Sequence, residues 1–286
     1  MQRKRKYGLV LPLIIWLIVF LLLPYFFILV QSFLQTDSFG IVQYKLNLDS
    51  YKEIFSNSLY YGTLLRTFGF ALIVAVVCVS LSIPLAYFIA FKVKKYKTLL
   101  YTLIVLPFWI SYIVRAYAWK IILGEQGILN TFLIRIHLTN HPLDFLLYSN
   151  FSTLVCLIHI FTPFVAIPVY TAFEQIPKSL VEASKDLGAG SFTTLRRIIF
   201  PLALPGIISG GTFALVLTMG DFLSPLLLGG PNTLFISNIV QNLFGTSNDK
   251  PLGSAVGIVV LALIFILLEI STKMEKKYSS LKSEPG

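Results

Sequence analysis

Long apolar segments recur along the chain and alternate with short polar stretches. A helix needs roughly 17 to 25 predominantly apolar residues to cross the hydrocarbon core of a bilayer, and these segments reach that length. The pattern therefore predicts an all-α integral membrane protein with six transmembrane helices. The predicted spans are Leu9–Gln31, Gly62–Phe91, Thr98–Leu123, Phe151–Phe173, Ile199–Leu228 and Pro251–Ile270.

Prolines fall inside these spans, at positions 24, 84, 107, 163, 205 and 225. In a membrane bundle, neighbouring helices and Ser or Thr hydroxyls can satisfy the backbone groups that a proline frees. We therefore expect kinks in these helices and no breaks.

Composition agrees with a membrane protein and excludes an ordinary soluble domain. The chain has 56% hydrophobic and 13% charged residues, where soluble domains have about 45 to 50% apolar and about 25% charged residues. Its mean hydropathy is +0.80. The net charge of +10 would suit nucleic acid, but the basic residues lie between apolar segments and form no single soluble face. A lipid bilayer is the expected surrounding, and nucleic acid is not an expected partner.

The basic residues also predict the orientation, because short cytoplasmic loops retain Lys and Arg. Of the 23 Lys and Arg residues, 16 fall on the side of the two termini and 4 on the opposite side. Both termini are therefore predicted to be cytoplasmic. The uncharged run at positions 7–34 is too long for a signal peptide and has no small-residue cleavage site, so we expect it to stay as the first span.

No residue pattern points to catalysis or to a cofactor. A Gly-rich loop ending in Gly-Lys-Ser or Gly-Lys-Thr does not occur, so ATP is not expected to bind by that route. The chain has two cysteines, Cys78 and Cys156, both inside apolar segments, and three histidines. We predict no catalytic residue, no metal site and no cofactor.

The loop between the fourth and fifth spans contains a short amphipathic helix, predicted at about residues 178–190. Leu180, Ala183 and Leu187 lie on one side at helical spacing, with charged residues on the other. Gly188 and Gly190 are expected to end it. Such a helix can dock into a groove of a soluble partner. Alternatively, it lies passively on the membrane surface, with Ser179 and Glu182 forming a capping box.

The same loop resembles the EAA loop of binding-protein-dependent ABC permeases. That pattern is Glu-Ala-Ala, three residues, Gly, nine residues, Ile, one residue and Leu-Pro. The matching positions are Glu182, Ala183, Gly188, Ile198 and Pro201, while Ser184 replaces the second alanine and Phe200 the leucine. The resemblance implies that this helix couples the permease to an ATPase. The coupling site then consists of Glu182, Ala183, Ser184, Gly188, Ile198 and Pro201.

The resemblance extends over residues 62–271 and implies a type I ABC importer permease of the bacterial inner membrane. The segments 106–119 and 220–231 resemble the polyamine branch, the spermidine/putrescine permeases, and related importers for opines, aminoethylphosphonate and ferric iron share much of them. Residues 1–61 are then an amino-terminal addition, with the first span and an external loop, and 272–286 a cytoplasmic tail. The implied partners are a cytoplasmic ABC ATPase dimer, a second permease subunit of different sequence and an external substrate-binding protein.

Ionisable residues inside spans are costly and mark candidate substrate sites. Arg115 lies 17 residues after Thr98, and Asp221 lies 17 residues after Leu204; both reference residues are at the inner part of a predicted span. In a straight helix, 17 residues correspond to a depth of about 25 Å across the membrane. Both are expected in the outer part of the membrane. Arg115 lines a pore or reaches the outer headgroups. Asp221 is expected to face either Arg115 or a cationic substrate.

Aromatic residues near Arg115 could hold ammonium groups through cation–π contacts. The candidates for the substrate pathway are Asp221, Arg115, Trp109, Tyr112 and Tyr117. Trp119 suits the aromatic belt at the membrane interface better. His159 has no evident partner, and Glu269 is expected to pair with Lys273, four residues on.

Two other functional classes are less well supported. An independent secondary transporter would be expected to show inverted repeats or ionisable relays, and a membrane enzyme would need clustered carboxylates or histidines. Neither feature is evident in the sequence. The leading hypothesis is a non-catalytic permease subunit that imports polyamines.

Overall fold

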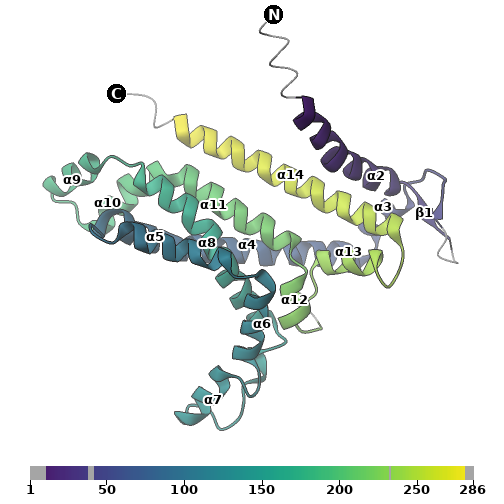
Figure 1. Cartoon of the computed structure of the whole chain (residues 1–286), viewed down its shortest axis with the longest axis horizontal. Coiled ribbons are helices and arrows are strands. Elements are labelled where there is room, and N and C mark those ends of the chain that lie inside the picture. The colour runs from purple at the N-terminus through teal and green to yellow at the C-terminus, as the bar shows by residue number, and fades with distance from the viewer. Residues whose placement is uncertain (1–10, 38–41, 232, 281–286) are drawn as a thin grey trace, which may run out of the picture. The chain divides into compact units, whose positions relative to one another are not determined.

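The computed structural model describes residues 11–37, 42–231 and 233–280 (Figure 1). The chain forms two compact units, one from Met1–Thr63 with Ser237–Leu263, and one from Leu64–Ile236 with Ile264–Gly286. The basic residues at positions 3–6 and at position 282 lie outside the described residues. Helices α4 (Ser58–Tyr87), α13 (Ile236–Phe244) and α14 (Lys250–Ser280) run from one unit into the other.

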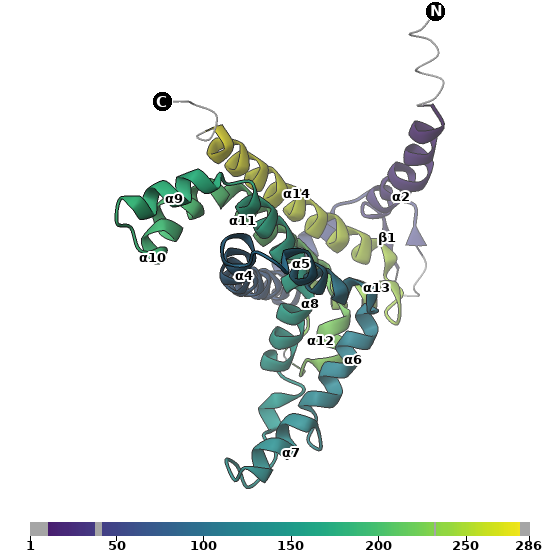
Figure 2. The same cartoon turned by 60° about the vertical axis from the view of Figure 1, so that its left-hand side comes forward.

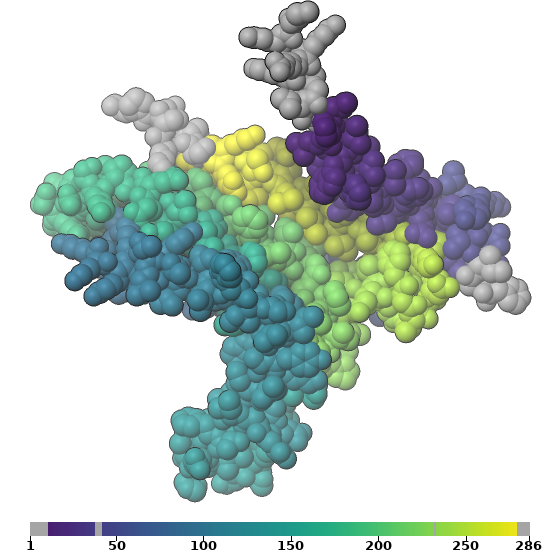
Figure 3. All heavy atoms as spheres, in the orientation of Figure 1, coloured from purple at the N-terminus to yellow at the C-terminus, as the bar shows by residue number. Residues whose placement is uncertain are grey.

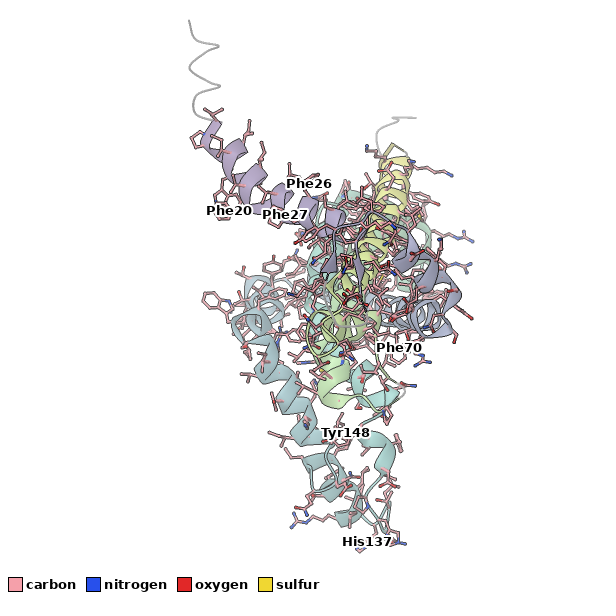
Figure 4. The ribbon with its side chains drawn as sticks, turned by 90° about the vertical axis from the view of Figure 1, so that its right-hand side faces the viewer. Phe20, Phe26, Phe27, Phe70, His137 and Tyr148 are labelled. Atoms are coloured by element: carbon pink, nitrogen blue, oxygen red, sulfur yellow. The ribbon has the colours of Figure 1, made fainter. Side chains whose placement is uncertain are left out.

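The first unit begins with the predicted first span, observed as one helical segment over Leu11–Gln31. It contains a π-helical turn, η1 (Ile18–Leu22), followed by α2 (Leu23–Gln31). Pro24 explains the wide turn, because its ring would clash with the carbonyl of Phe20 in a regular α-helix. The side chains of the segment Leu11–Gln31 are not buried by other parts of the chain, and Phe20, Phe26 and Phe27 point away from the helix (Figure 4).

Short elements complete the first unit. Strands β1 (Gln35–Thr36) and β2 (Val42–Gln43) pair antiparallel, and α3 (Asp49–Ser56) follows. The hydroxyl of Ser254 donates to Gln31 at 3.0 Å, and that of Thr36 donates to Asp249 at 2.8 Å. These two hydrogen bonds connect the end of α2 and β1 to the start of α14.

The core of the second unit lies around α8 (Asn150–Glu174) and α11 (Phe200–Gly220), which pack against each other. Glycines allow the close approach of these two helices. A Cβ on Gly210 would lie 3.0 Å from the carbonyl oxygen of Val165, and one on Gly206 would overlap Ala172. Pro163 and Pro168 lie inside α8 without ending it. The second, fourth and sixth predicted spans are confirmed as α4 with the π turn η2 (Phe88–Lys92), as α8 and as α14.

The third predicted span is not one straight helix. It consists of α5 (Lys97–Val105), the 3₁₀ turn η3 (Leu106–Trp109) and α6 (Tyr112–Leu123), and the helices on either side of the break differ in direction by 91°. Ile110 and Ser111, which lie between η3 and α6, have an extended backbone conformation. The expectation of kinks without breaks is therefore wrong here, and the straight-helix depth derived for Arg115 does not apply.

The loop after α6 carries α7 (Ile128–Arg135) and the 3₁₀ turn η4 (Asp144–Leu146). His137, labelled in Figure 4, has a left-handed φ of 56° just after α7. The fifth predicted span is also shorter than expected, because α11 ends at Gly220 and α12 (Leu223–Leu228) is a separate helix. Asp221 therefore lies in a connection between two helices.

Five helical segments are long and apolar enough to cross a bilayer, and the bent pair supplies a sixth if it counts as one span. The predicted all-α membrane fold is confirmed within the described part of the chain.

Candidate coupling segment and substrate cavity

The segment between α8 and α11 folds as α9 (Lys178–Asp186), α10 (Ser191–Thr194) and the π turn η5 (Leu195–Ile199). We call residues 178–199 the coupling segment. Gly188 has φ +79°, and its N–H donates to the carbonyl of Lys185 at 2.8 Å. A left-handed residue just after a helix satisfies carbonyls of its last turn. The prediction that Gly188 ends the helix is confirmed, whereas Gly190 has φ −68° and is the N-cap residue of α10.

The buried side of α9 differs from the predicted stripe. Val181 and Ser184 are buried, and the Ser184 hydroxyl lies 2.8 Å from that of Thr194. The serine that replaces an alanine of the EAA pattern thus connects α9 to α10. The predicted capping box does not form, because α9 begins at Lys178 and its N-cap residue, Pro177, makes no side-chain hydrogen bond.

The outer side of the coupling segment carries apolar residues. Leu180 is 44% exposed, Leu187 is 89% exposed and Phe192 is 74% exposed. Glu182, Ala183 and Pro201 are exposed as well, while Ile198 is half-buried. In Figure 2, α9 and α10 lie side by side at one end of the second unit, beyond α11. The segment therefore presents a contact surface that the rest of its unit does not cover.

An ion pair lies directly before the coupling segment. Lys97 Nζ, at the start of α5, lies 2.7 Å from Glu174 Oε1 at the end of α8, and it also donates to the carbonyl of Ala90 at 3.2 Å. One turn further along, the rings of Tyr101 and Tyr170 are 5.2 Å apart. These contacts join α5 and α8 where α8 leads into α9.

A cavity of about 480 Å³ lies at the far end of α11 from the coupling segment, and it contains both predicted intramembrane charges. We call it the Asp221 cavity. It lies at the break in the third span. Its lining includes Phe108, Tyr112, Arg115, Phe161, Phe164 and Asp221.

Asp221 is 8% exposed. Its carboxylate accepts hydrogen bonds from the backbone amides of Leu223 at 3.1 Å and Ser224 at 3.3 Å, and so caps the start of α12. The hydroxyls of Tyr112 and Ser224 lie 2.7 Å apart and hold α6 against α12. Asp221 therefore has a structural role that sequence reasoning missed, because it lies one position before the N-cap residue of α12, Phe222, where a capping side chain is not expected.

Arg115 is also 8% exposed, and its guanidinium donates to the carbonyl of Ile160 at 3.5 Å. Its carbon Cζ lies 6.0 Å from the centre of the Tyr112 ring. The Nε atom is buried without a hydrogen-bond partner among the described residues. Arg115 thus lies against α8 and does not extend away from the protein.

Of the aromatic residues predicted for the substrate pathway, one lines the cavity and two do not. Tyr112 lines the cavity, but Trp109 is 87% exposed and Tyr117 is 48% exposed, and neither belongs to the lining. Trp119 is half-buried, and its ring meets His159 edge-on at 5.6 Å, which supplies the partner that the sequence did not reveal. The ion pair of Glu269 with Lys273 is confirmed at 3.3 Å. Across the described ranges, no three His, Cys, Asp or Glu side chains come together as a metal site would require.

Comparisons with known proteins agree with this architecture. Residues 82–278 match the family described as binding-protein-dependent transport system inner membrane component. The chain is 34% identical, over 261 residues and 91% of each chain, to the spermidine/putrescine transport system permease protein PotB of Haemophilus influenzae. It is also 34% identical to PotB of Escherichia coli, over 253 residues covering 88% of this chain and 91% of that protein.

A solved structure has the same fold. It is a chain of a bacterial alginate ABC transporter in complex with alginate pentasaccharide-bound periplasmic protein, with a TM-score of 0.79 and 20% identity, and the match covers 96% of this chain and 95% of that one. The helical membrane fold and the EAA-type segment thus define an ABC importer permease. The chain belongs to the family of binding-protein-dependent inner-membrane permeases and is a multi-pass subunit of such an importer.

Proposed function

We propose that this permease imports polyamines, spermidine and putrescine being the preferred cargo, together with a second permease subunit, a cytoplasmic ATPase dimer and an external substrate-binding protein. The observation that carries the cargo assignment is a buried carboxylate in an aromatic-lined cavity between membrane helices. Similarity to PotB over most of the chain supports it. This chain itself catalyses no reaction in the proposal.

Asp221 is the proposed anionic site. A carboxylate can accept about four hydrogen bonds, so capping α12 is compatible with holding an ammonium group of the cargo. The faces of Tyr112, Phe161 and Phe164 around it would add cation–π attraction. Arg115 lines the same cavity.

The coupling segment is the proposed contact with the ATPase, on the predicted orientation with both termini in the cytoplasm. Support comes from the exposed apolar side chains of Leu180, Leu187 and Phe192, which a soluble partner could cover. Closure of the ATPase dimer would move α9 and, through the end of α8, the helices that line the cavity. The Lys97–Glu174 ion pair supports this route, because it makes α5 follow α8.

One observation favours a second cargo class. Arg115 and Asp221 line the same cavity, and two opposite charges in one site suit a zwitterion such as an opine or an aminoethylphosphonate. Import of a zwitterionic solute is therefore the second candidate function.

Uptake by the reconstituted importer tests the cargo. The permease, its partner permease, the ATPase and the binding protein are assembled in proteoliposomes, and ATP-dependent uptake of labelled spermidine and putrescine is measured. Uptake that excess aminoethylphosphonate does not reduce is the expected result. Uptake of the zwitterion alone would favour the second candidate, and the absence of any ATP-dependent uptake of either class would contradict both.

A further inference from the structure

A second cavity lies beside the Asp221 cavity in the same unit. Its volume is about 590 Å³, and we call it the Glu275 cavity. The two cavities share Phe108 and Phe164, whose rings meet edge-on with their centres 4.5 Å apart. This aromatic pair therefore separates two neighbouring spaces.

The two cavities follow each other along α11. The Asp221 cavity is lined by Leu217, Gly220 and Asp221 at the end of the helix, and the Glu275 cavity by Leu202, Pro205, Gly206 and Ser209 near its beginning. The 12 residues from Ser209 to Asp221 correspond to about 18 Å along a helix. A cargo that passes from one cavity to the other would therefore move along the direction in which the helix crosses the membrane.

Among the residues that the structure describes, Glu275, on α14, is the only charged one in the lining of the second cavity. Its Oε1 accepts a hydrogen bond from the buried Ser271 at 3.1 Å, and the Ser271 hydroxyl lies 2.8 Å from Thr212 Oγ1 on α11. These hydroxyls hold the carboxylate on the side of α14 that faces α11. Glu275 also lines a smaller adjoining cavity of about 290 Å³.

The rest of the lining suits a primary ammonium group. Phe108, Phe164 and Phe213 offer ring faces, and Thr171, Gln175 and Ser209 offer oxygen acceptors. One carboxylate among aromatic rings and neutral acceptors binds an alkylammonium ion through a charge-assisted hydrogen bond and cation–π contacts. An anion would find no basic side chain among the described residues of this lining.

We propose that Glu275 forms a second cation-binding site, which receives an ammonium group of the cargo after it has passed the Phe108–Phe164 pair. The proposal rests on the proposed function, polyamine import. On the predicted orientation, this second site lies on the cytoplasmic side of the Asp221 cavity and so precedes release.

The same helix supplies a matched control. Glu269 lies six residues before Glu275, belongs to neither lining and is exposed in its ion pair with Lys273. The test compares Glu275→Gln, the conservative Glu275→Asp and the control Glu269→Gln in the reconstituted importer. Labelled spermidine uptake and the ATP hydrolysis stimulated by the loaded binding protein are measured together.

Glu275→Gln is expected to lower spermidine uptake about tenfold, the effect of one lost charge-assisted hydrogen bond, while stimulated ATP hydrolysis stays intact. Glu275→Asp should keep much of the uptake, and Glu269→Gln should behave as the unaltered protein. Unchanged uptake in Glu275→Gln would overturn the proposal. So would a parallel loss of uptake and ATP hydrolysis, which would indicate a role in assembly or coupling.

Occupancy is tested separately with a Glu275→Cys variant. Both native cysteines are buried, so a cationic methanethiosulfonate should modify position 275 first, and spermidine should slow this modification. A Glu269→Cys variant should be modified at the same rate with and without spermidine. Equal rates at position 275 would overturn the second site. If the unaltered importer takes up spermidine, this failure leaves polyamine import standing, whereas a lack of uptake by the unaltered importer would remove both.

Discussion

The coupling segment and the Asp221 cavity reverse the usual distribution of apolar and charged groups. In the coupling segment, which is a polar connection between spans, Leu187 and Phe192 are largely exposed. In the Asp221 cavity, which lies among apolar helices, two charged residues are each 8% exposed. Each reversal costs free energy, since exposed apolar surface and buried charge are both unfavourable. In the proposed function each is explained by a partner, which is a soluble protein in the first region and a charged solute in the second.

The two regions also differ in how their geometry is fixed. The coupling segment depends on local contacts, such as the left-handed Gly188 and the Ser184–Thr194 hydrogen bond. The Asp221 cavity depends on α6, α8, α11 and α12 meeting at one place. In Figure 3 the coupling segment lies at the surface, whereas the two charged residues of the cavity are each 8% exposed. A substitution should therefore have different consequences in the two regions.

The largest effect is expected from Gly188→Val. A β-branched residue at φ +79° costs about 2 kcal/mol, or roughly thirtyfold in an equilibrium constant, and should redirect the chain between α9 and α10. Spermidine uptake by the reconstituted importer should fall by about that factor. Gly188→Asn is the control, because Asn tolerates the left-handed conformation, and it should keep most of the uptake. Equal losses in both variants would mean that conformation is not what Gly188 supplies.

A tenfold effect is expected from Asp221→Asn. The amide keeps the size of the side chain and can still accept from α12 but loses the negative charge, so spermidine uptake should fall about tenfold. Stimulated ATP hydrolysis should persist, because α9 and α10 are untouched. Asp221→Ala, which removes the cap of α12 as well, should reduce the amount of folded protein by comparison. Unchanged uptake kinetics in Asp221→Asn would remove Asp221 from the substrate site.

The smallest effect is expected from Leu187→Ser. Burial of a leucine against a partner contributes about 1 to 2 kcal/mol, so the affinity for the ATPase should fall about fivefold or more, as measured by co-purification at increasing dilution. The stability of the permease should not change, because Leu187 contacts little of its own chain. Leu46, which is 74% exposed on the predicted external side, is the control. If Leu46→Ser weakens the complex equally, the coupling segment is not the specific contact.

The coupling segment could be predicted from sequence because its signals are local. The spacing from Glu182 to Pro201 identifies the family, and Gly188 marks the end of the helix. The buried side of α9 could not be predicted, because it depends on contacts with other elements, such as the hydrogen bond between Ser184 and Thr194 of α10, ten residues on. The apolar stripe of Leu180 and Leu187 faces outward instead.

The cavity was predictable only in part. Hydropathy alone brings out Arg115 and Asp221, since charges are rare in spans. Their common cavity depends on contacts between distant segments, such as Tyr112 with Ser224. Trp109 and Tyr117 are close to Arg115 in the sequence but outside the lining. Tyr117 lies two residues after Arg115 in the same helix, α6, and therefore on another side of it. Trp109 lies before the break in the third span and is 87% exposed. The four-residue spacing of Glu269 and Lys273 was sufficient for their ion pair, which needs only one helix.

The interruption of the third span at Ile110 and Ser111 has a consequence for solvation. Backbone amides and carbonyls that leave a helix cannot face lipid tails, where nothing accepts or donates hydrogen bonds. Both residues line the Asp221 cavity, so a wet interior can hydrate them. The interruption of the helix therefore needs the water-accessible Asp221 cavity beside it. An unbroken third helix would have no freed backbone groups to hydrate. In the broken one, the N–H of Ile110 donates to Pro107 and the carbonyl of Ser111 accepts from Arg115, so the carbonyl of Ile110 and the N–H of Ser111 are the groups that water in the hollow would hydrate.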